Sequence, residues 1–363
     1  MNKSARNTDL YHIESSGSAD QIGRHYGAAL AAPIKEMVQA SMRMLRSRYE
    51  TGRIKVAIEA MSETFRSNFP YLWEEINGIC AGTGIQREDF LGHIFRPGVL
   101  LFGEEDGCTN IIFPDSDKGP LVGKTHDATT PDANPVVVRV IRPEGVYSVL
   151  TIGHLDGISI MTGLNEKGLA VGETSIHFST VDRSGTVRNL LPRPLLHQCA
   201  TVKEAVEFLE VHPLLRMGFH FALVDAAGDS AIVERSPTEQ NVRWGQGEVM
   251  FCTNHTVTPH MRAKELSRGE LGDRNSDTRY ANLERLVSER DFSTSLESMK
   301  TLMKFHDPAG GICQHGDSGY KGPKISFYPM FTQRAFINMA KAGKLLVADG
   351  NPCSGEFLEF TLK

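Results

Sequence analysis

The feature that most constrains the fold is a change of sequence pattern near residue 107. Before it, apolar residues recur at helical spacing; after it, short runs rich in β-branched residues alternate with turn residues. Strands, then helices, then strands again follow along the rest of the chain. This order predicts an α+β fold in which two antiparallel sheets pack face to face with helical layers outside, an αββα sandwich.

Four helices are expected in the first hundred residues. Ser18 and Gln21 have the spacing of a capping box and open a long helix, which Pro33 kinks or breaks. The other three helices are expected over residues 54–65, 71–80 and 87–94.

The second part of the chain is expected to contain both strands and helices. Strands are predicted over residues 108–113, 121–126, 136–141, 147–152, 158–162, 169–174, 219–225, 230–235, 249–252, 344–348 and 357–362. Helices are predicted over residues 194–199, 202–210, 278–288, 296–305 and 331–342.

Composition narrows the class of partner. The 39 basic and 44 acidic residues give a net charge of −5 without long runs of one sign, which argues against a nucleic acid or an anionic membrane and favours a small molecule or peptide. The N-terminus is polar and no apolar run approaches ~20 residues, so no signal peptide or membrane span is expected.

The cysteines favour a reducing, cytoplasmic environment. No pair of them has the CxxC spacing of a zinc or redox motif, and 363 residues can form a core without disulfides. The six are Cys80, Cys108, Cys199, Cys252, Cys313 and Cys353.

The pair Gly107–Cys108, within the run Glu104 to Asn110, predicts a self-processing site. Cleavage between the two residues would leave Cys108 as a new N-terminus that carries both a thiol and an α-amine. Such an amine titrates near ~7.7–8.0 and can accept the thiol proton at neutral pH. Gly107 suits the attacked position because it has no Cβ. A Gly–Cys pair alone is more often a loop cysteine behind a turn glycine.

Four stretches of the chain together resemble one known family. They are Asp106 to Thr109, Lys124 to Asp127, Gly163 to Leu169 and Thr253 to His255. They resemble the acyl-coenzyme A:6-aminopenicillanate (isopenicillin N) acyltransferase family, whose members are N-terminal-nucleophile (Ntn) hydrolases. More distantly, the chain is similar to penicillin V acylases and bile-salt hydrolases.

The resemblance implies an αββα sandwich, autoproteolysis before the nucleophile and action on non-peptide amide bonds. Residues 1–107 would become a helical α chain and residues 108–363 the catalytic β chain, together forming one Ntn-hydrolase domain. Neither a metal nor an organic cofactor is required.

The resemblance also assigns roles to two residues near the nucleophile. Asp127, 19 residues after Cys108, would orient the Cys108 amine; the alternative is an aspartate that caps the turn at Ala128. Asn254 would donate Nδ2–H to the oxyanion formed when the thiol adds to a carbonyl; the alternative is an asparagine that supports its own turn.

Two further assignments come from the same resemblance. A backbone amide near Thr174 or Ser175 would be the second oxyanion donor. Arg279, at the start of a helix capped by Asn275 or Ser276, would favour the Cys108 thiolate and a neutral amine. Its alternative is a solvated arginine on an exposed helix face.

The sequence therefore predicts an autoproteolytic N-terminal cysteine amidohydrolase or acyltransferase that forms a Cys108 thioester. Its expected partners are a small-molecule amide or acyl substrate and its own cleaved N-terminal chain; the motifs leave open a homo-oligomer and whether water or an amine takes the acyl group. One alternative is a papain-like protease with an internal Cys108 and His126, His255 or His315 as base, although the papain signature is missing. The other is a non-enzymatic binding sandwich with an inert Cys108.

Overall fold

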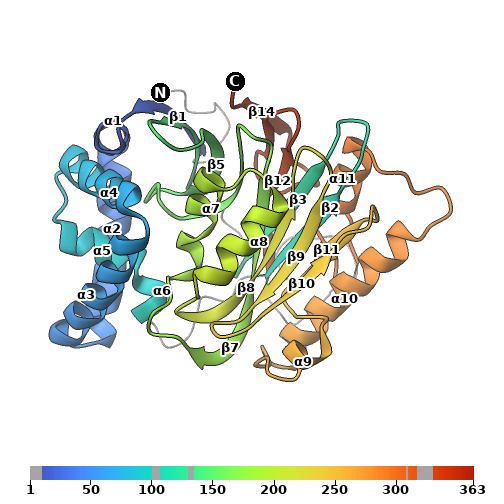
Figure 1. Cartoon of the computed structure of the whole chain (residues 1–363). Coiled ribbons are helices and arrows are strands. Elements are labelled where there is room, and N and C mark those ends of the chain that lie inside the picture. Colours follow the sequence, from blue (N-terminus) through green and yellow to red (C-terminus); the bar gives the residue numbers. More distant parts are fainter. Residues whose placement is uncertain (1–9, 100–106, 130–134, 308–309, 317–329) are drawn as a thin grey trace.

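The computed structural model describes residues 10–99, 107–129, 135–307, 310–316 and 330–363, and Glu104 to Asp106 of the self-processing motif lie outside these ranges. Two stacked sheets are enclosed by helices on both sides (Figure 1). In Figure 1 the N-terminal helices, in blue, lie on one side and α10 and α11, in orange, on the other, with the strands between them. The predicted four-layer αββα sandwich is confirmed.

Within the described residues, the first sheet has eight strands and the second has six. In spatial order, the first contains β1 (Leu10–Gly17), β4 (Val136–Pro143), β5 (Val149–His154), β6 (Ile160–Asn165), β7 (Ala170–Val181), β8 (Arg216–Val224), β9 (Ser230–Arg235) and β10 (Gln240–Trp244). The second contains β11 (Met250–Cys252), β2 (Gly107–Phe113), β3 (Leu121–Ala128), β12 (Phe331–Met339), β13 (Lys344–Ala348) and β14 (Phe357–Thr361). Neighbouring strands are antiparallel except β1 and β4, which are parallel.

Helices cover the outer face of each sheet. On the first sheet lie α1 (Ala19–Ala29), α2 (Ala31–Arg48), α3 (Thr51–Asn68), α4 (Pro70–Thr83), α5 (Arg87–Ile94), α6 (Arg96–Val99), α7 (Pro192–Gln198) and α8 (Val202–Val211), with a 3₁₀ turn at Arg188–Leu190. On the second sheet lie α10 (Glu270–Val287) and α11 (Leu296–Met303). The short helix α9 (Pro259–Arg262) connects β11 to α10.

Hydrophobic clusters fill the three spaces between the four layers. Phe65 and Phe69 of the N-terminal helices belong to the same cluster as Val171 of the first sheet. A second cluster lies between the sheets and includes Ile112. The third joins the second sheet to α10 and α11 and includes Met299. Alternate residues of each inner strand therefore contribute to different clusters, which fixes the register of the sheets.

The N-terminal helices largely follow their sequence signals. The capping box is present, with Gln21 N–H donating to the Ser18 hydroxyl and Ser18 N–H donating to the Gln21 side chain. The long first helix breaks into α1 and α2 at Leu30, three residues before Pro33. Predicted residues 87–94 coincide with α5.

The structure differs from the sequence predictions in several elements. A helix was predicted over residues 331–342, but Phe331–Met339 form strand β12. The strand is buried on both faces, which removes the alternation of exposed and buried residues by which a strand is recognised. Two strands were not predicted, β1, which pairs with β4 in parallel, and β10, which pairs with β9. Helix α10 is capped at Gly269, so Asn275 and Ser276 lie inside it rather than capping it.

No helix in the described part of the chain is both long and apolar enough to cross a membrane.

Candidate active site

Cys108 lies near the start of β2, between β11 and β3 in the second sheet, and is 2% exposed. Strand alternation turns its side chain toward the first sheet, because Asn110, two residues on, donates from Nδ2 to the Thr174 hydroxyl of β7. Register places Gly107 opposite Asp127 and Cys108 opposite His126. The thiol therefore lies on the inner face of the second sheet, near one end of the two facing sheets.

Two side chains hold the backbone of Cys108. Its N–H donates to Oδ1 of Asn254 at 2.9 Å, and its carbonyl oxygen accepts from Nη1 of Arg279 at 2.7 Å. Nη2 of Arg279 also donates to Oδ1 of Asn254, at 2.7 Å. The nitrogen and the carbonyl of one residue are thus fixed by a connected pair of buried groups.

Asn254 follows strand β11 and is fully buried. Its own N–H donates to the Ser276 hydroxyl at 2.9 Å, and its Nδ2 donates to the backbone oxygen of Ser175 at 3.1 Å. The side chain therefore spans from Cys108 on the second sheet to β7 on the first. This brings together three of the predicted site residues, with Thr174 next to Ser175 on β7.

Arg279 is fully buried, so the alternative of a solvated arginine on an exposed face was wrong. Besides the Cys108 carbonyl and Asn254, its guanidinium donates to the Thr109 hydroxyl at 2.8 Å and to Oδ1 of Asn275 at 3.0 Å. Arg279 lies in α10, which packs on the second sheet, and its long side chain reaches the start of β2. The planar guanidinium has several N–H donors, so it can bind all of these acceptors at once.

Asp127 lies on β3 with its carboxylate on the other face of the sheet from the thiol. Oδ1 accepts from the Thr332 hydroxyl at 2.6 Å, and Oδ2 accepts from Nε2 of Gln314 at 2.7 Å. A Cβ on Gly107 would lie 3.4 Å from Oδ2, so the carboxylate sits against the residue that precedes Cys108. Burial raises the pKa of Asp127, and the nearby charge of Arg279 opposes that shift.

Gly107 is packed too closely for a side chain. An added Cβ would lie 2.7 Å from Cε of Met330 and 3.3 Å from Cβ of Asp127. Because Gly107 has no side chain, Met330 and Asp127 can pack directly against the backbone next to the Gly107–Cys108 bond.

Lys124 is a site residue to which sequence reasoning gave no role. It is fully buried on β3, and its ammonium contacts both the Cys108 side chain and Glu173 on β7, with Nζ 3.3 Å from the Glu173 carboxylate. Burial acts to lower the pKa of Lys124, but the charges of Cys108 and Glu173 and their hydrogen bonds raise it overall. The available signal was a lysine on the same face of β3 as the buried Val122, two residues before it.

The three histidines considered as bases in the papain-like alternative have different surroundings. His126 lies directly opposite Cys108 on β3. His255 is hydrogen-bonded through Nδ1 to the Ser276 hydroxyl at 2.8 Å and lies 3.3 Å from the Asp277 carboxylate. His315 belongs to a separate group with His306 and two cysteines.

The four layers form an Ntn-hydrolase fold, and a cysteine on one of its strands is surrounded by buried amide, carboxylate, guanidinium and ammonium groups. A model of the family described as acyl-coenzyme A:6-aminopenicillanic acid acyl-transferase matches residues 114–325, more than half of the chain. The chain belongs to this family and is an enzyme of the amide-hydrolysing or acyl-transferring type. Lys124, Asp127, Asn254 and Arg279 lie inside the matched range, which begins just after Cys108.

Several solved structures are similar to the chain over 70% of its length. A mutant conjugated bile acid hydrolase from Clostridium perfringens is 15% identical, with a TM-score of 0.45 and 97% of its chain covered. Penicillin V acylase from Agrobacterium tumefaciens is 18% identical, with a TM-score of 0.41 and 86% covered. An N-acylethanolamine-hydrolyzing acid amidase ortholog from Caenorhabditis elegans is 14% identical, with a TM-score of 0.42 and 100% covered. No curated protein sequence matches the chain.

Proposed function

We propose that the chain cleaves itself after Gly107 and then uses Cys108 as an N-terminal nucleophile on a small-molecule amide or acyl substrate. The observation that carries this proposal is the hydrogen bond from the Cys108 nitrogen to Oδ1 of Asn254. Because this nitrogen would become the α-amine, an acceptor that orients it is already in place before cleavage.

The self-cleavage step joins the thiol to the carbonyl carbon of Gly107. The Cys108 sulfur adds to that carbon, the peptide C–N bond breaks, and the nitrogen takes up a proton to become the α-amine. Water then hydrolyses the Gly107 thioester, which leaves a carboxylate on Gly107 and a free thiol on Cys108. Close packing around Gly107 supports this step because it restrains the attacked carbonyl.

Catalysis would use the same groups on an external amide. The Cys108 thiol passes its proton to the α-amine and the sulfur adds to the substrate carbonyl; the Lys124 ammonium favours the thiolate because it lies against the sulfur. Nδ2 of Asn254 and a backbone amide near Thr174 or Ser175 would stabilise the oxyanion. The departing amine takes the proton back, and water or a second amine then releases the acyl group from Cys108.

The two predicted chains would stay associated after cleavage. Strand β1 pairs with β4 over eight residues, and α1 to α5 bury apolar side chains against the first sheet. Asp127, beside Gly107, and Arg279, on the Cys108 carbonyl, would position the cleaved terminus.

Intact mass under denaturing conditions tests the proposal. The wild type should give two chains of about 12 and about 28 kDa, in proportion to their lengths, that elute together when native. Cys108→Ala should stay one chain of full mass and be inactive. Cys80→Ala, which removes a buried thiol in α4, should be cleaved like the wild type.

An active wild-type protein that stays in one chain would overturn the N-terminal mechanism, because its α-amine would still be a peptide nitrogen. That result would favour the papain-like alternative with an internal Cys108. Cleavage of Cys108→Ala at the same bond would equally contradict self-processing by this thiol.

A further inference from the structure

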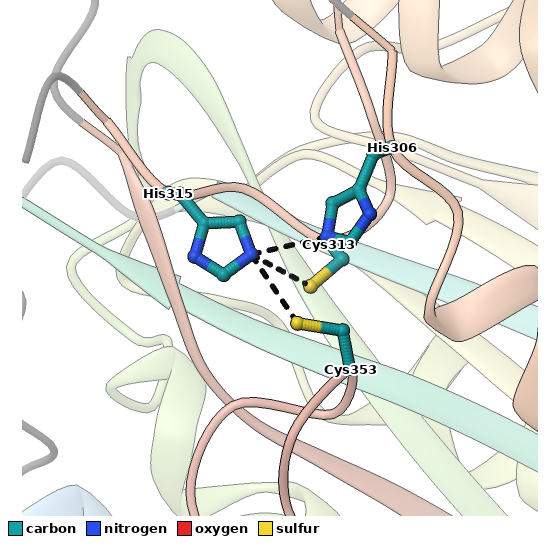
Figure 2. Close-up of side chains that lie close together, drawn as sticks. All are labelled: His306, Cys313, His315 and Cys353. Atoms are coloured by element: carbon teal, nitrogen blue, oxygen red, sulfur yellow. Dashed lines mark hydrogen bonds between the residues drawn. The ribbon is translucent and has the colours of Figure 1, made fainter. Parts of the chain in front are cut away.

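Four side chains away from Cys108 converge on one point (Figure 2). They are His306 after α11, Cys313 and His315 in the loop that follows, and Cys353 in the turn between β13 and β14. One nitrogen or sulfur atom from each lies within 4.8 Å of the other three. Residues from three separate segments thus bring two imidazoles and two thiols together.

The distances from Nε2 of His315 to the other three ligand atoms fit tetrahedral coordination. Zinc–sulfur bonds of about 2.3 Å and zinc–nitrogen bonds of about 2.0–2.1 Å place tetrahedral ligand atoms roughly 3.3 Å apart for two nitrogens and roughly 3.6 Å apart for a nitrogen and a sulfur. Nε2 of His315 lies 3.0 Å from Nε2 of His306, 3.5 Å from Sγ of Cys313 and 3.4 Å from Sγ of Cys353. We propose that His306, Cys313, His315 and Cys353 bind one zinc ion.

Charge and protonation are compatible with this ion. A neutral imidazole has one unprotonated ring nitrogen, so His306 and His315 can each supply one ligand atom through Nε2. Two thiolates would neutralise the 2+ charge of zinc. Burial raises the pKa of the Cys313 thiol, so the metal must displace a proton that the thiol otherwise keeps.

Both thiols also contact one amide oxygen. Both thiols donate to Oδ1 of Asn351, at 3.0 Å from Cys313 and 2.9 Å from Cys353. Zinc binding would release these protons to solvent, and Oδ1 would keep the N–H of Cys353 as a donor at 3.2 Å. Cys353 is exposed, which gives an ion a route into the cluster.

The ion would have a structural role. Four protein ligands leave no coordination position for a substrate. They tie the loop after α11 to the β13–β14 turn, and Gln314 lies between two of the ligands in sequence. Because Gln314 donates from Nε2 to Asp127 and from its N–H to the Thr332 hydroxyl at 2.8 Å, the ion would fix the loop that supports Asp127.

Metal binding can be tested without an activity assay. The protein, prepared with a tag that binds no metal and kept reduced, is stripped with a chelator and titrated anaerobically with Co²⁺. One equivalent per chain should produce the intense visible bands of tetrahedral cobalt and a thiolate-to-cobalt charge-transfer band. Zinc should then abolish both, and elemental analysis should find one zinc per chain.

Ligand variants and matched controls locate the site. Cys353→Ser and His315→Ala should lose the charge-transfer band or reduce it strongly, and retain well below one zinc per chain after dialysis. Cys80→Ala removes a thiol elsewhere and His260→Ala removes an exposed imidazole, so both should bind one equivalent like the wild type. Circular dichroism checks that the variants fold.

Three results would overturn the proposal. One is a reduced wild-type protein that takes up neither cobalt nor zinc. The second is a cobalt spectrum without tetrahedral or thiolate bands, and the third is metal binding by folded Cys353→Ser as strong as that of Cys80→Ala. If Cys313 and Cys353 form a disulfide and the protein still binds no metal after reduction, the first result applies. The two cysteines would then be a redox pair and not zinc ligands.

Discussion

The backbone nitrogen of Cys108 donates to Oδ1 of Asn254 at 2.9 Å, while Nδ2 of the same asparagine donates to the backbone oxygen of Ser175. The Asn254 side chain therefore accepts a hydrogen bond from the nitrogen of Cys108 through Oδ1 and donates one to β7 through Nδ2. The two functions can be separated by substitution, because aspartate keeps the acceptor and lacks the donor.

We expect Asn254→Ala to lower kcat by about 10²–10³-fold if Nδ2 stabilises the oxyanion, with little change in substrate binding. Asn254→Asp should lose a similar factor in kcat yet still be cleaved after Gly107, because it keeps an oxygen for the Cys108 nitrogen. Steady-state kinetics and intact mass measure the two effects. A normal kcat in either variant would remove the amide from the mechanism.

Lys124 offers a test of how the thiol is activated. Removing its ammonium in Lys124→Met should shift the pH profile of Cys108 alkylation upward and slow alkylation at pH 7 by about tenfold or more, because a neighbouring cation favours the thiolate. Lys124→Arg should restore much of the rate, and Lys344→Met, which removes an exposed ion-pair lysine from the same sheet, should change nothing. Alkylation is followed at Cys108 by peptide mass. An unchanged profile in Lys124→Met would contradict this role.

Much of the fold was predictable because local signals agreed with it. The capping box at Ser18 and the helix over Arg87–Ile94 are encoded by nearby residues, and both are present. Strand β12 was assigned wrongly because its residues are buried on both faces, between the sheets and under α11, which removes the alternation typical of a strand. Burial on both faces is a property of the assembled layers and not of the segment.

Some residues of the candidate site could likewise be found from the sequence, and others only from the structure. Motifs and the family resemblance pointed to the Gly107–Cys108 junction, Asp127, Asn254 and Arg279 as candidates, and the structure brings these residues together. The role of Lys124 depends on β3 facing β7, which only the stacked sheets reveal. Likewise His306 and Cys353 lie far apart in sequence and meet only when the loop after α11 reaches the β13–β14 turn.

Glu265 gives a prediction for stability as a function of pH. Burial raises the pKa of Glu265 from 4.5 to about 7. Hydrogen bonds from the N–H and the hydroxyl of Thr256 act in the opposite direction and lower the pKa. Thr256 lies in the loop that carries Asn254. Between these two pH values the folded protein holds a proton that the unfolded chain releases. Stability from this group therefore falls as pH rises from about 4.5 to about 7 and is level above that.

Glu265→Gln fixes the neutral form and removes this dependence. The difference in Tm, variant minus wild type, should increase from pH 4.5 to pH 7 and stay constant above it. Glu289→Gln, at an exposed ion pair, serves as the control and should give a flat difference. A flat difference for Glu265→Gln as well would show that its carboxyl titrates normally.

Asp127 has two interpretations, a carboxylate that orients the Cys108 α-amine and a carboxylate that caps the turn at Ala128, and they predict different effects of substitution. Its carboxylate accepts from Thr332 and Gln314 and lies against Gly107, so Asp127→Asn should remove a charge near the future α-amine and disturb two hydrogen bonds. We expect kcat to fall by about 10²-fold, the cost of a small misplacement of a reacting group. Loss of the negative charge should also lower the pKa of the α-amine, which would move the acidic limb of the kcat/KM profile to lower pH.

Asp225→Asn is the matched control, since Asp225 is another buried carboxylate and accepts hydrogen bonds from the backbone N–H groups of Val202 and Ala227. It should reduce Tm without moving the pH profile. The two readouts separate positioning from scaffold effects, because a general loss of stability lowers the amount of active enzyme but leaves the pKa of the amine unchanged. If Asp127→Asn matched Asp225→Asn in both kcat and acidic limb, the turn-capping interpretation of Asp127 would be the correct one.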